Sequence, residues 1–177
     1  MNAALTLKAA HFAAEKHKNQ RRKDVEASPY INHPLALVSV LAGDGAIEET
    51  DVLCAALLHD TIEDTDTTAD ELTGIFGAKI ASIVLEVTNN PNLAKAEQKA
   101  EQVRRAPLMS PEAKLVKLAD KICNLRDILN TPPADWSSDR KREYFESAAK
   151  VVAGLRGASP KLEAIFDGVY AQRSVFS

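Results

Sequence analysis

The spacing of apolar residues constrains the fold of this chain more than any other feature. Nearly every segment repeats its apolar residues with a helical period of about 3.6, and no segment alternates apolar and polar residues over the length of a strand. The 7 glycines and 8 prolines fall mainly between the periodic stretches. We therefore predict an all-α fold, a bundle of about nine to ten helices. The predicted helices cover 3–18, 34–43, 48–61, 68–76, 78–89, 93–106, 111–129, 138–156 and 160–174.

Helix starts and loops can also be located from the sequence. Thr68 stands three residues before Glu71 as in a capping box, and Ser110 and Ser159 each precede a proline, a combination typical of a helix start. The longest non-periodic stretches, 19–32 and 130–137, are predicted loops that are too short to separate domains. A length of 177 residues suits one folding unit, so we predict a single compact domain over 1–177.

Composition excludes several classes of function. The 22 Lys and Arg against 25 Asp and Glu give a net charge of -3, which argues against general nucleic-acid binding. No stretch approaches the roughly 20 apolar residues of a membrane span, and the N-terminus lacks a signal-peptide pattern. We therefore expect a cytoplasmic protein without a membrane partner. Cys54 and Cys123 lack zinc-site spacing and are predicted to be buried, reduced thiols.

The pair His59-Asp60 follows an apolar run, LCAALL, at the predicted end of a buried helix. A histidine near a helix C-terminus beside an aspartate that begins a loop is a common arrangement without chemical function. The pair alone therefore predicts little, and its meaning depends on which residues it faces.

Two other segments offer partners for this pair. In PYINHP, residues 29–34, His33 is predicted at a helix start, where it is either a hydrogen-bond donor or a metal ligand. In KLVKLADKICNLRDI, residues 114–128, the helical period places Asp120, Asn124 and Asp127 on one face, opposite the leucines. That polar face is either solvated or directed toward a site.

Imidazoles and carboxylates from these segments would form a mixed nitrogen and oxygen site for a divalent ion such as Mn²⁺, Fe²⁺, Co²⁺ or Zn²⁺. A metal in such a site activates water and polarises a phosphoryl oxygen, which is the chemistry of phosphate-ester hydrolysis. Ligand type alone does not choose among these metals. The candidate ligands are His33, His59, Asp60 and Asp120.

Charged residues near these ligands suggest further roles. Glu63 and Asp64 lie three and four residues after Asp60, and would orient the attacking water or move protons if the chain folds back at 61–62. The alternative interpretation is that Glu63 and Asp64 belong to a solvated acidic loop without a chemical role. The basic run 21–23 precedes His33 by about ten residues, and next to a metal it would bind a polyphosphate.

Four segments together resemble a known family: RRK…PYINHP, ALLHDTIEDTDTT, FGAKIASIVLEVT and KLVKLADKICNLRDI. They are similar to HD-domain hydrolases of Rel/SpoT type, and most of all to the stand-alone small alarmone hydrolases, a group that includes the metazoan SpoT homologue. The resemblance runs from Ala9 to Arg173. It implies a compact HD-domain helical bundle that hydrolyses the nucleotides ppGpp and pppGpp at the 3′ position. The implied products are pyrophosphate and GDP or GTP, and the usual metal is Mn²⁺.

The resemblance also assigns roles by position. It places metal ligands at His33, His59, Asp60 and Asp120, and catalytic acids at Glu63 and Asp64. The implied substrate-binding residues are Arg22, Lys23, Asn124, Arg140, Tyr144 and Lys95.

Two features bear on how far the resemblance extends. The segment between Arg22 and His33 is two residues longer than in the long bifunctional enzymes and matches the stand-alone hydrolases. The sequence ends at Ser177, without a nucleotidyltransferase domain, so the resemblance predicts degradation of alarmone and no synthesis.

Two rival functions remain open at this level. One is an HD phosphohydrolase acting on another nucleotide, such as a 2′-phosphatase of NADPH. The other is a nucleotide-binding or interaction module without catalysis, against which the intact set of ligands and acids counts. The oligomeric state and any regulator stay open.

Overall fold

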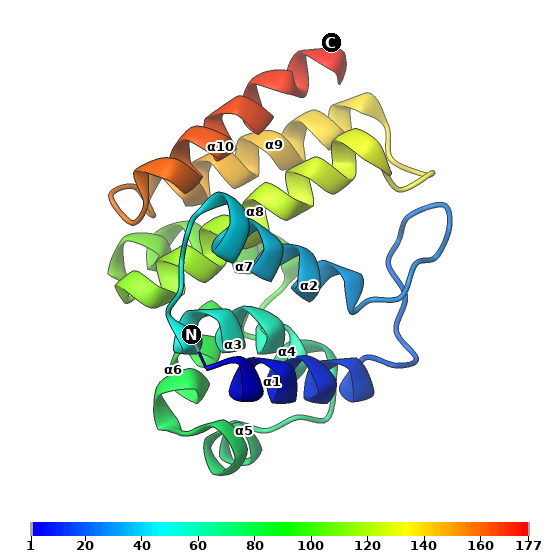
Figure 1. Ribbon diagram of the computed structural model, residues 1–177. Coiled ribbons are helices and arrows are strands. Elements are labelled where there is room, and N and C mark those ends of the chain that lie inside the picture. The colour runs from blue at the N-terminus through cyan, green and yellow to red at the C-terminus, as the bar shows by residue number, and fades with distance from the viewer. Residues whose placement is uncertain (1, 177) are drawn as a thin grey trace.

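The computed structural model describes residues 2–176, and within them the chain is helical with no β-strand (Figure 1). The prediction of an all-α fold is confirmed. The helices are α1 (Ala3–Lys16), α2 (Asn32–Ser39), α3 (Thr50–Leu58), α4 (Thr61–Asp64), α5 (Ala69–Phe76), α6 (Ala78–Val87), α7 (Lys95–Arg105), α8 (Pro111–Asn130), α9 (Ser138–Ala153) and α10 (Pro160–Ala171). A π-helical turn follows α2 at Val40–Asp44, and short 3₁₀ turns cover Ala106–Leu108 and Gln172–Phe176.

Helix α8 occupies the centre of the molecule, with α9 and α10 on one side and α1, α3 and α5 on the other (Figure 1). It contacts α2, α3, α6, α9 and α10. Its side chains are buried on more than one face, because Leu118 and Ile122 are fully buried and Asp120 is also buried. The polar face predicted from the sequence is therefore buried at Asp120, while Asn124 and Asp127 are only partly buried.

Helix α3 is a buried apolar helix that ends just before His59. Every residue from Val52 to Leu58 is buried, and the helix packs against α1, α2, α6 and α8. The predicted helix 48–61 was too long, since α3 ends at Leu58 and α4 begins at Thr61. The break has a local cause: the Thr61 hydroxyl donates to the Leu58 carbonyl oxygen over 2.7 Å, which satisfies an acceptor at the helix end.

The structure also tests the predicted caps, loops and cysteines. The side chains of Thr68, Ser110 and Ser159 each accept a backbone N–H three residues later, so these caps are confirmed. Helix α2 begins at Asn32, two residues earlier than predicted, and His33 lies in its first turn. The two predicted loops do connect helices. Both cysteines are buried and free, as expected.

Within the described part of the chain, no helix combines the length and the apolar character that crossing a membrane requires.

Candidate active site

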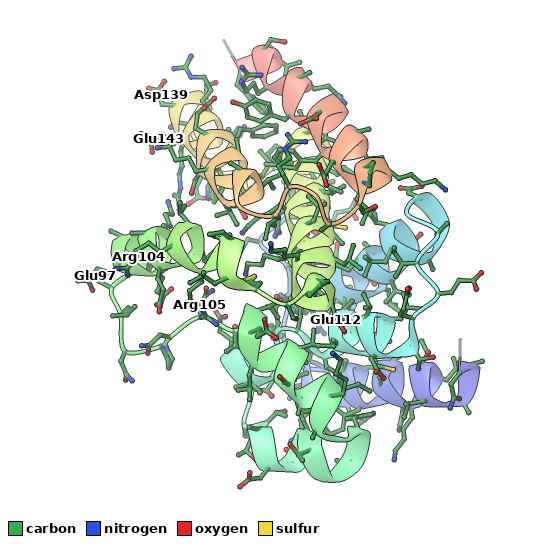
Figure 2. All side chains as sticks on the ribbon, turned by 90° about the vertical axis from the view of Figure 1, so that its left-hand side faces the viewer. Glu97, Arg104, Arg105, Glu112, Asp139 and Glu143 are labelled. Carbon is green, nitrogen blue, oxygen red and sulfur yellow. The ribbon has the colours of Figure 1, made fainter. Side chains whose placement is uncertain are left out.

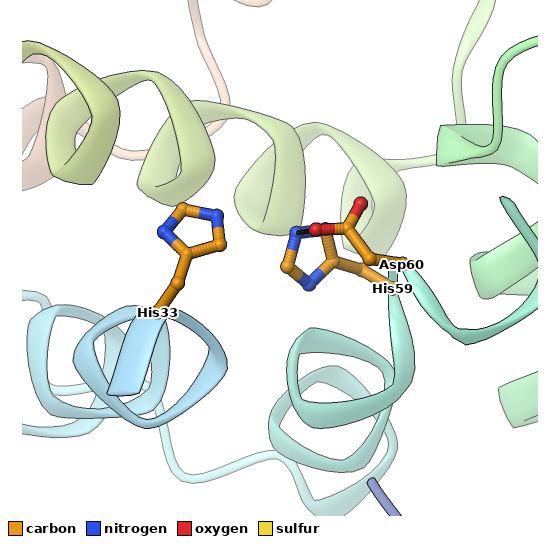
Figure 3. Close-up of side chains that lie close together, drawn as sticks. All are labelled: His33, His59 and Asp60. Atoms are coloured by element: carbon orange, nitrogen blue, oxygen red, sulfur yellow. Dashed lines mark ion pairs between the residues drawn. The ribbon is translucent and has the colours of Figure 1, made fainter. Parts of the chain in front are cut away.

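His33, His59 and Asp60 lie close together beneath α8 (Figure 3), and Asp120 of α8 lies near both histidines. Ligand atoms of His33, His59 and Asp60 all lie within 4.8 Å of one another. His59 Nε2 is 2.9 Å from Asp60 Oδ2, and Asp120 Oδ1 is 3.3 Å from His33 Nε2 and 4.0 Å from His59 Nε2. The four residues come from α2, from the break between α3 and α4, and from α8. The structure thus brings together all four residues predicted as ligands.

The hydrogen bond of the second ring nitrogen sets the tautomer of His59. Its Nδ1 donates to the Ala56 carbonyl oxygen over 2.8 Å, so the Nε2 of a neutral ring carries a lone pair. That Nε2 is buried, has no hydrogen-bond partner among residues 2–176 and faces the carboxylates of Asp60 and Asp120. A lone pair and two anionic oxygens directed at one point need a cation between them. The donor set therefore fits a divalent metal ion.

The pKa values of these groups reflect the same need for positive charge. Burial opposes protonation of His59, but the adjacent Asp60 carboxylate outweighs it and raises the imidazole pKa to about 9. Burial would raise the pKa of Asp60, yet the charge of His59 holds it below its usual range. Without a metal, a proton on His59 balances the carboxylates.

Two buried lysines of α8 lie behind the carboxylates. Lys121 Nζ is 3.5 Å from Asp120 Oδ2, and this contact raises the lysine pKa although burial opposes it. Lys117 Nζ donates to the Val87 carbonyl oxygen over 3.2 Å, and burial lowers its pKa. Both charges, with His33, hold the pKa of Asp120 well below its usual value although burial opposes this. Lys121 was not singled out from the sequence, because a lysine on a helix is usually solvated.

A pocket of about 560 Å³ opens onto this cluster. Eight of the twelve residues that the sequence predicted for the site line this pocket. His59 and Asp120 do not line it, but they contact Asp60 and His33, which do. The predicted residues that line it are Arg22, Lys23, His33, Asp60, Glu63, Asp64, Asn124 and Tyr144.

The two candidate catalytic acids lie on the short helix α4, which supplies the change of direction expected at 61–62. Both oxygens of the Glu63 carboxylate accept hydrogen bonds from Asn89, one from its backbone N–H and one from Nδ2, each over 3.0 Å. Oδ2 of Asp64 accepts from Gln20 Nε2 over 2.8 Å. Gln20 is itself bonded to the buried ring of His17, 2.6 Å away. Each acid is therefore held from a different part of the chain.

The basic and amide residues are also held in place. Arg22 pairs with Asp127 of α8, and its guanidinium lies 5.7 Å from the centre of the Tyr30 ring. Asn124 Nδ2 donates to Asp120 Oδ1 over 2.6 Å, so this amide contacts a candidate ligand directly. Lys23 is exposed at the pocket wall.

Two predicted substrate residues do not line the pocket. The Arg140 guanidinium lies over the Trp136 ring, 4.4 Å from its centroid, and Trp136 does line the pocket. Lys95 is exposed at the N-terminus of α7 and is not part of the pocket wall. The structure therefore places Arg140 next to the site and leaves Lys95 outside it.

Sequence reasoning missed several residues of the pocket. Tyr30 lay inside the PYINHP segment, and Asp127 had already been placed on the polar face of α8, so both had a usable signal. Trp136 is the only tryptophan of the chain and stands in a proline-rich loop, which is unusual enough to be noticed. Gln20 gave no signal, because nothing local distinguishes it from a solvated glutamine.

Comparison with known proteins agrees with this geometry. The family model described as "HD domain" matches residues 9–160. Guanosine-3′,5′-bis(diphosphate) 3′-pyrophosphohydrolases named MESH1 from Homo sapiens and Danio rerio are 52% and 50% identical, over 98% of this chain and 97% of each relative. A solved structure, described as a metazoan orthologue of SpoT that hydrolyses ppGpp, matches with a TM-score of 0.94 and 40% identity, covering 99% of this chain and 98% of the other. The chain belongs to the HD domain family.

Proposed function

We propose that this protein hydrolyses ppGpp and pppGpp at the 3′ position, releasing pyrophosphate with GDP or GTP. One observation carries the proposal: a single pocket holds a His and Asp cluster, two acids on α4, and the basic residues Arg22 and Lys23. The proposal also draws on the relatives, since the MESH1 proteins bear the name of this activity and cover nearly the whole chain.

The residues that would hold the metal are His33, His59, Asp60 and Asp120. Imidazole and carboxylate ligands together suit several divalent ions, and we propose Mn²⁺. When bound, the ion would supply activation of a water molecule and polarisation of a phosphoryl oxygen. The bond from His59 Nδ1 to the Ala56 carbonyl fixes the orientation in which Nε2 faces the site.

Glu63 and Asp64 are the proposed catalytic acids. With its carboxylate held by Asn89, Glu63 would orient the attacking water, and Asp64 beside it would accept a proton. Positioning of this kind removes the need to order these groups during the reaction. Because both acids line the same pocket, they would reach the same substrate group.

The remaining contacts would orient the nucleotide. Arg22 and Lys23 would offset the negative charge of the substrate diphosphate, and Asn124 would contact the ribose. Tyr144 and Trp136, whose ring centroids are 5.6 Å apart, offer aromatic surface for a base, and the Arg140 guanidinium lies over the Trp136 ring. Lys95 stays a prediction without a contact in the pocket.

The test is product analysis with metal-stripped protein incubated with ppGpp, with and without Mn²⁺. We expect GDP and pyrophosphate to appear in equal amounts and only when metal is added. A parallel incubation with NADPH checks the rival substrate. Release of inorganic phosphate from NADPH without cleavage of ppGpp would replace the proposed substrate, and tight binding of ppGpp without turnover would replace the proposed activity.

A further inference from the structure

A continuous chain of side-chain contacts joins the metal cluster to Glu63 by a route outside the pocket. Lys121 Nζ, 3.5 Å from Asp120 Oδ2, donates to Gln102 Oε1 over 3.1 Å. Gln102 Nε2 donates to Asn89 Oδ1 over 3.0 Å, and Asn89 Nδ2 donates to Glu63 Oε1 over 3.0 Å. Neither Gln102 nor Asn89 lines the pocket, so this chain of contacts reaches Glu63 from outside the pocket.

The chemistry of the two ends fixes the direction of this chain. A lysine ammonium only donates and a carboxylate only accepts, so each amide between them must turn its oxygen toward Lys121 and its nitrogen toward Glu63. Hydrogen bonds that end on a charge are stronger than neutral ones, and bonds in series polarise one another. Reversing either amide would bring an oxygen against the Glu63 carboxylate or a donor against Lys121.

Gln102 is also one of the residues that fix α7 to the protein. No residue of α7 is fully buried, and its partly buried face is mostly polar, with Val103 packed against the core. On that face Gln98 donates to the Asn90 and Leu93 carbonyls, and Arg105 donates to the Thr88 and Glu86 carbonyls. Figure 2 shows α7 at the flank of the molecule, with Glu97 and Arg104 directed outward. The side chain amide of Gln102 thus connects α7, an exposed helix, to the hydrogen bonds that end on Glu63.

We propose that Gln102 is a positioning residue, which holds Glu63 in its working orientation through Asn89. The inference rests on the proposed function of Glu63 as a catalytic acid. It adds that the site depends on α7, a helix that contributes nothing to the pocket lining described above.

The kinetic test uses two substitutions of Gln102. Gln102→Met keeps the shape and removes both hydrogen bonds, whereas Gln102→Glu keeps the acceptor for Lys121 and removes the donor to Asn89. Both should lower kcat for ppGpp about tenfold or more, the effect of one lost hydrogen bond in such a network, and leave KM within about twofold. Gln98→Met is the matched control, since it removes a glutamine of the same face that does not contact Asn89. An equal loss in Gln98→Met, or full kcat in Gln102→Glu, would overturn the proposal.

A double substitution separates positioning from general damage. In a Glu63→Gln background, Gln102→Met should cause less than a twofold further change in kcat, because the residue through which it acts is already altered. An additive loss of tenfold would mean that Gln102 acts elsewhere, and the proposal would fail.

A measurement independent of turnover completes the test. In the full chain loaded with Zn²⁺, which is diamagnetic, the side-chain amide ¹H and ¹⁵N signals of Asn89 and Gln102 should both shift in Glu63→Gln, and the Gln98 amide should not. Unmoved Asn89 and Gln102 signals would overturn the positioning role. A wild-type chain that fails to cleave ppGpp contradicts the proposed function instead, and the amide shifts still decide whether the chain of contacts exists.

Discussion

The Tyr30 hydroxyl donates a hydrogen bond to Oδ2 of Asp60, the same oxygen that lies 2.9 Å from His59 Nε2. Burial, together with the Asp60 charge, raises the tyrosine pKa far above its usual value, so the hydroxyl keeps its proton and remains a donor. Tyr30 thereby holds one candidate ligand at the oxygen that faces His59, while its ring packs against His17. Partners of this kind orient ligands and tune their affinity for the ion.

Replacing Tyr30 with phenylalanine should weaken Mn²⁺ binding about tenfold to a hundredfold, because Asp60 loses the bond that orients it. The measurement is calorimetric titration of metal-stripped protein with Mn²⁺. Tyr170→Phe is the control, since that hydroxyl bonds to Glu146, which does not line the pocket. An unchanged dissociation constant in Tyr30→Phe would show that the bond to Asp60 has no influence on the metal.

Arg22→Gln should raise KM for ppGpp about tenfold to a hundredfold with a smaller change in kcat, because Arg22 would bind the substrate phosphates by charge-assisted hydrogen bonds. Steady-state kinetics at two salt concentrations check this, and the effect should shrink at high salt. Arg126→Gln serves as the control, since Arg126 pairs with Asp44 away from the pocket. Equal effects of the two substitutions would contradict a specific role for Arg22.

The metal-free protein should lose stability as the pH rises from about 6.5 to about 9. His59 has a pKa raised from 6.5 to about 9, so its protonated form stabilises the fold fully below 6.5 and this contribution disappears through 9. The lowered pKa of Asp60 acts at the other end, since its contribution is lost only as the pH falls below 3.8. The free energy of unfolding, measured by urea denaturation, should be a few kcal/mol lower at pH 9 than at pH 6.

Two comparisons isolate the cause of this pH dependence. Asp60→Asn removes the partner that raises the His59 pKa, so the decline between pH 6.5 and 9 should largely vanish. Mn²⁺ binding needs the deprotonated ring, so its affinity should rise over the same range. A decline that persists in Asp60→Asn would assign the pH dependence to other groups.

Leu58→Ala should lower the free energy of unfolding by about 2–5 kcal/mol, because the side chain is fully buried next to His59 and its removal leaves a cavity. Leu85→Ala is the matched control, since Leu85 is 45% exposed, and it should cost less than about 1 kcal/mol. Chemical denaturation of both variants provides the comparison. Equal losses would contradict the burial that anchors the end of α3.

Periodicity and capping signals were sufficient for the fold. The apolar spacing predicted α3 as a buried helix and α8 as an amphipathic helix, and the cap at Thr68 marked the start of α5, because such features act over a few residues. The end of α3 was predicted three residues too late, at 61 instead of Leu58, since it depends on which carbonyl the Thr61 hydroxyl bonds. The helical period alone does not show where a helix ends. A glycine or proline would mark the end, and none stands between Leu58 and Thr61.

Site residues that lie within a short motif could be predicted from the sequence. Residues that reach the site from distant segments could not. PYINHP and LLHDTIED each contain chemically suitable side chains, so their combination was visible in the sequence. Asn89 and Gln102 contact Glu63 and Lys121 only because the fold brings α7 and the segment after α6 within hydrogen-bond distance of α4 and α8. The buried lysines were hidden for a different reason: Asp120 stands beside Lys121 in the chain, but the sequence does not show that both side chains are buried.

The most direct test of the central claim compares wild type with Asp60→Ala in the release of pyrophosphate from ppGpp at saturating Mn²⁺. Removing a ligand should disrupt both metal retention and water activation. We expect stoichiometric GDP and pyrophosphate from the wild type, and a rate at least about a thousandfold lower in Asp60→Ala when circular dichroism shows the variant folded. Near-normal release of pyrophosphate by folded Asp60→Ala would contradict the assignment of Asp60 as a metal ligand.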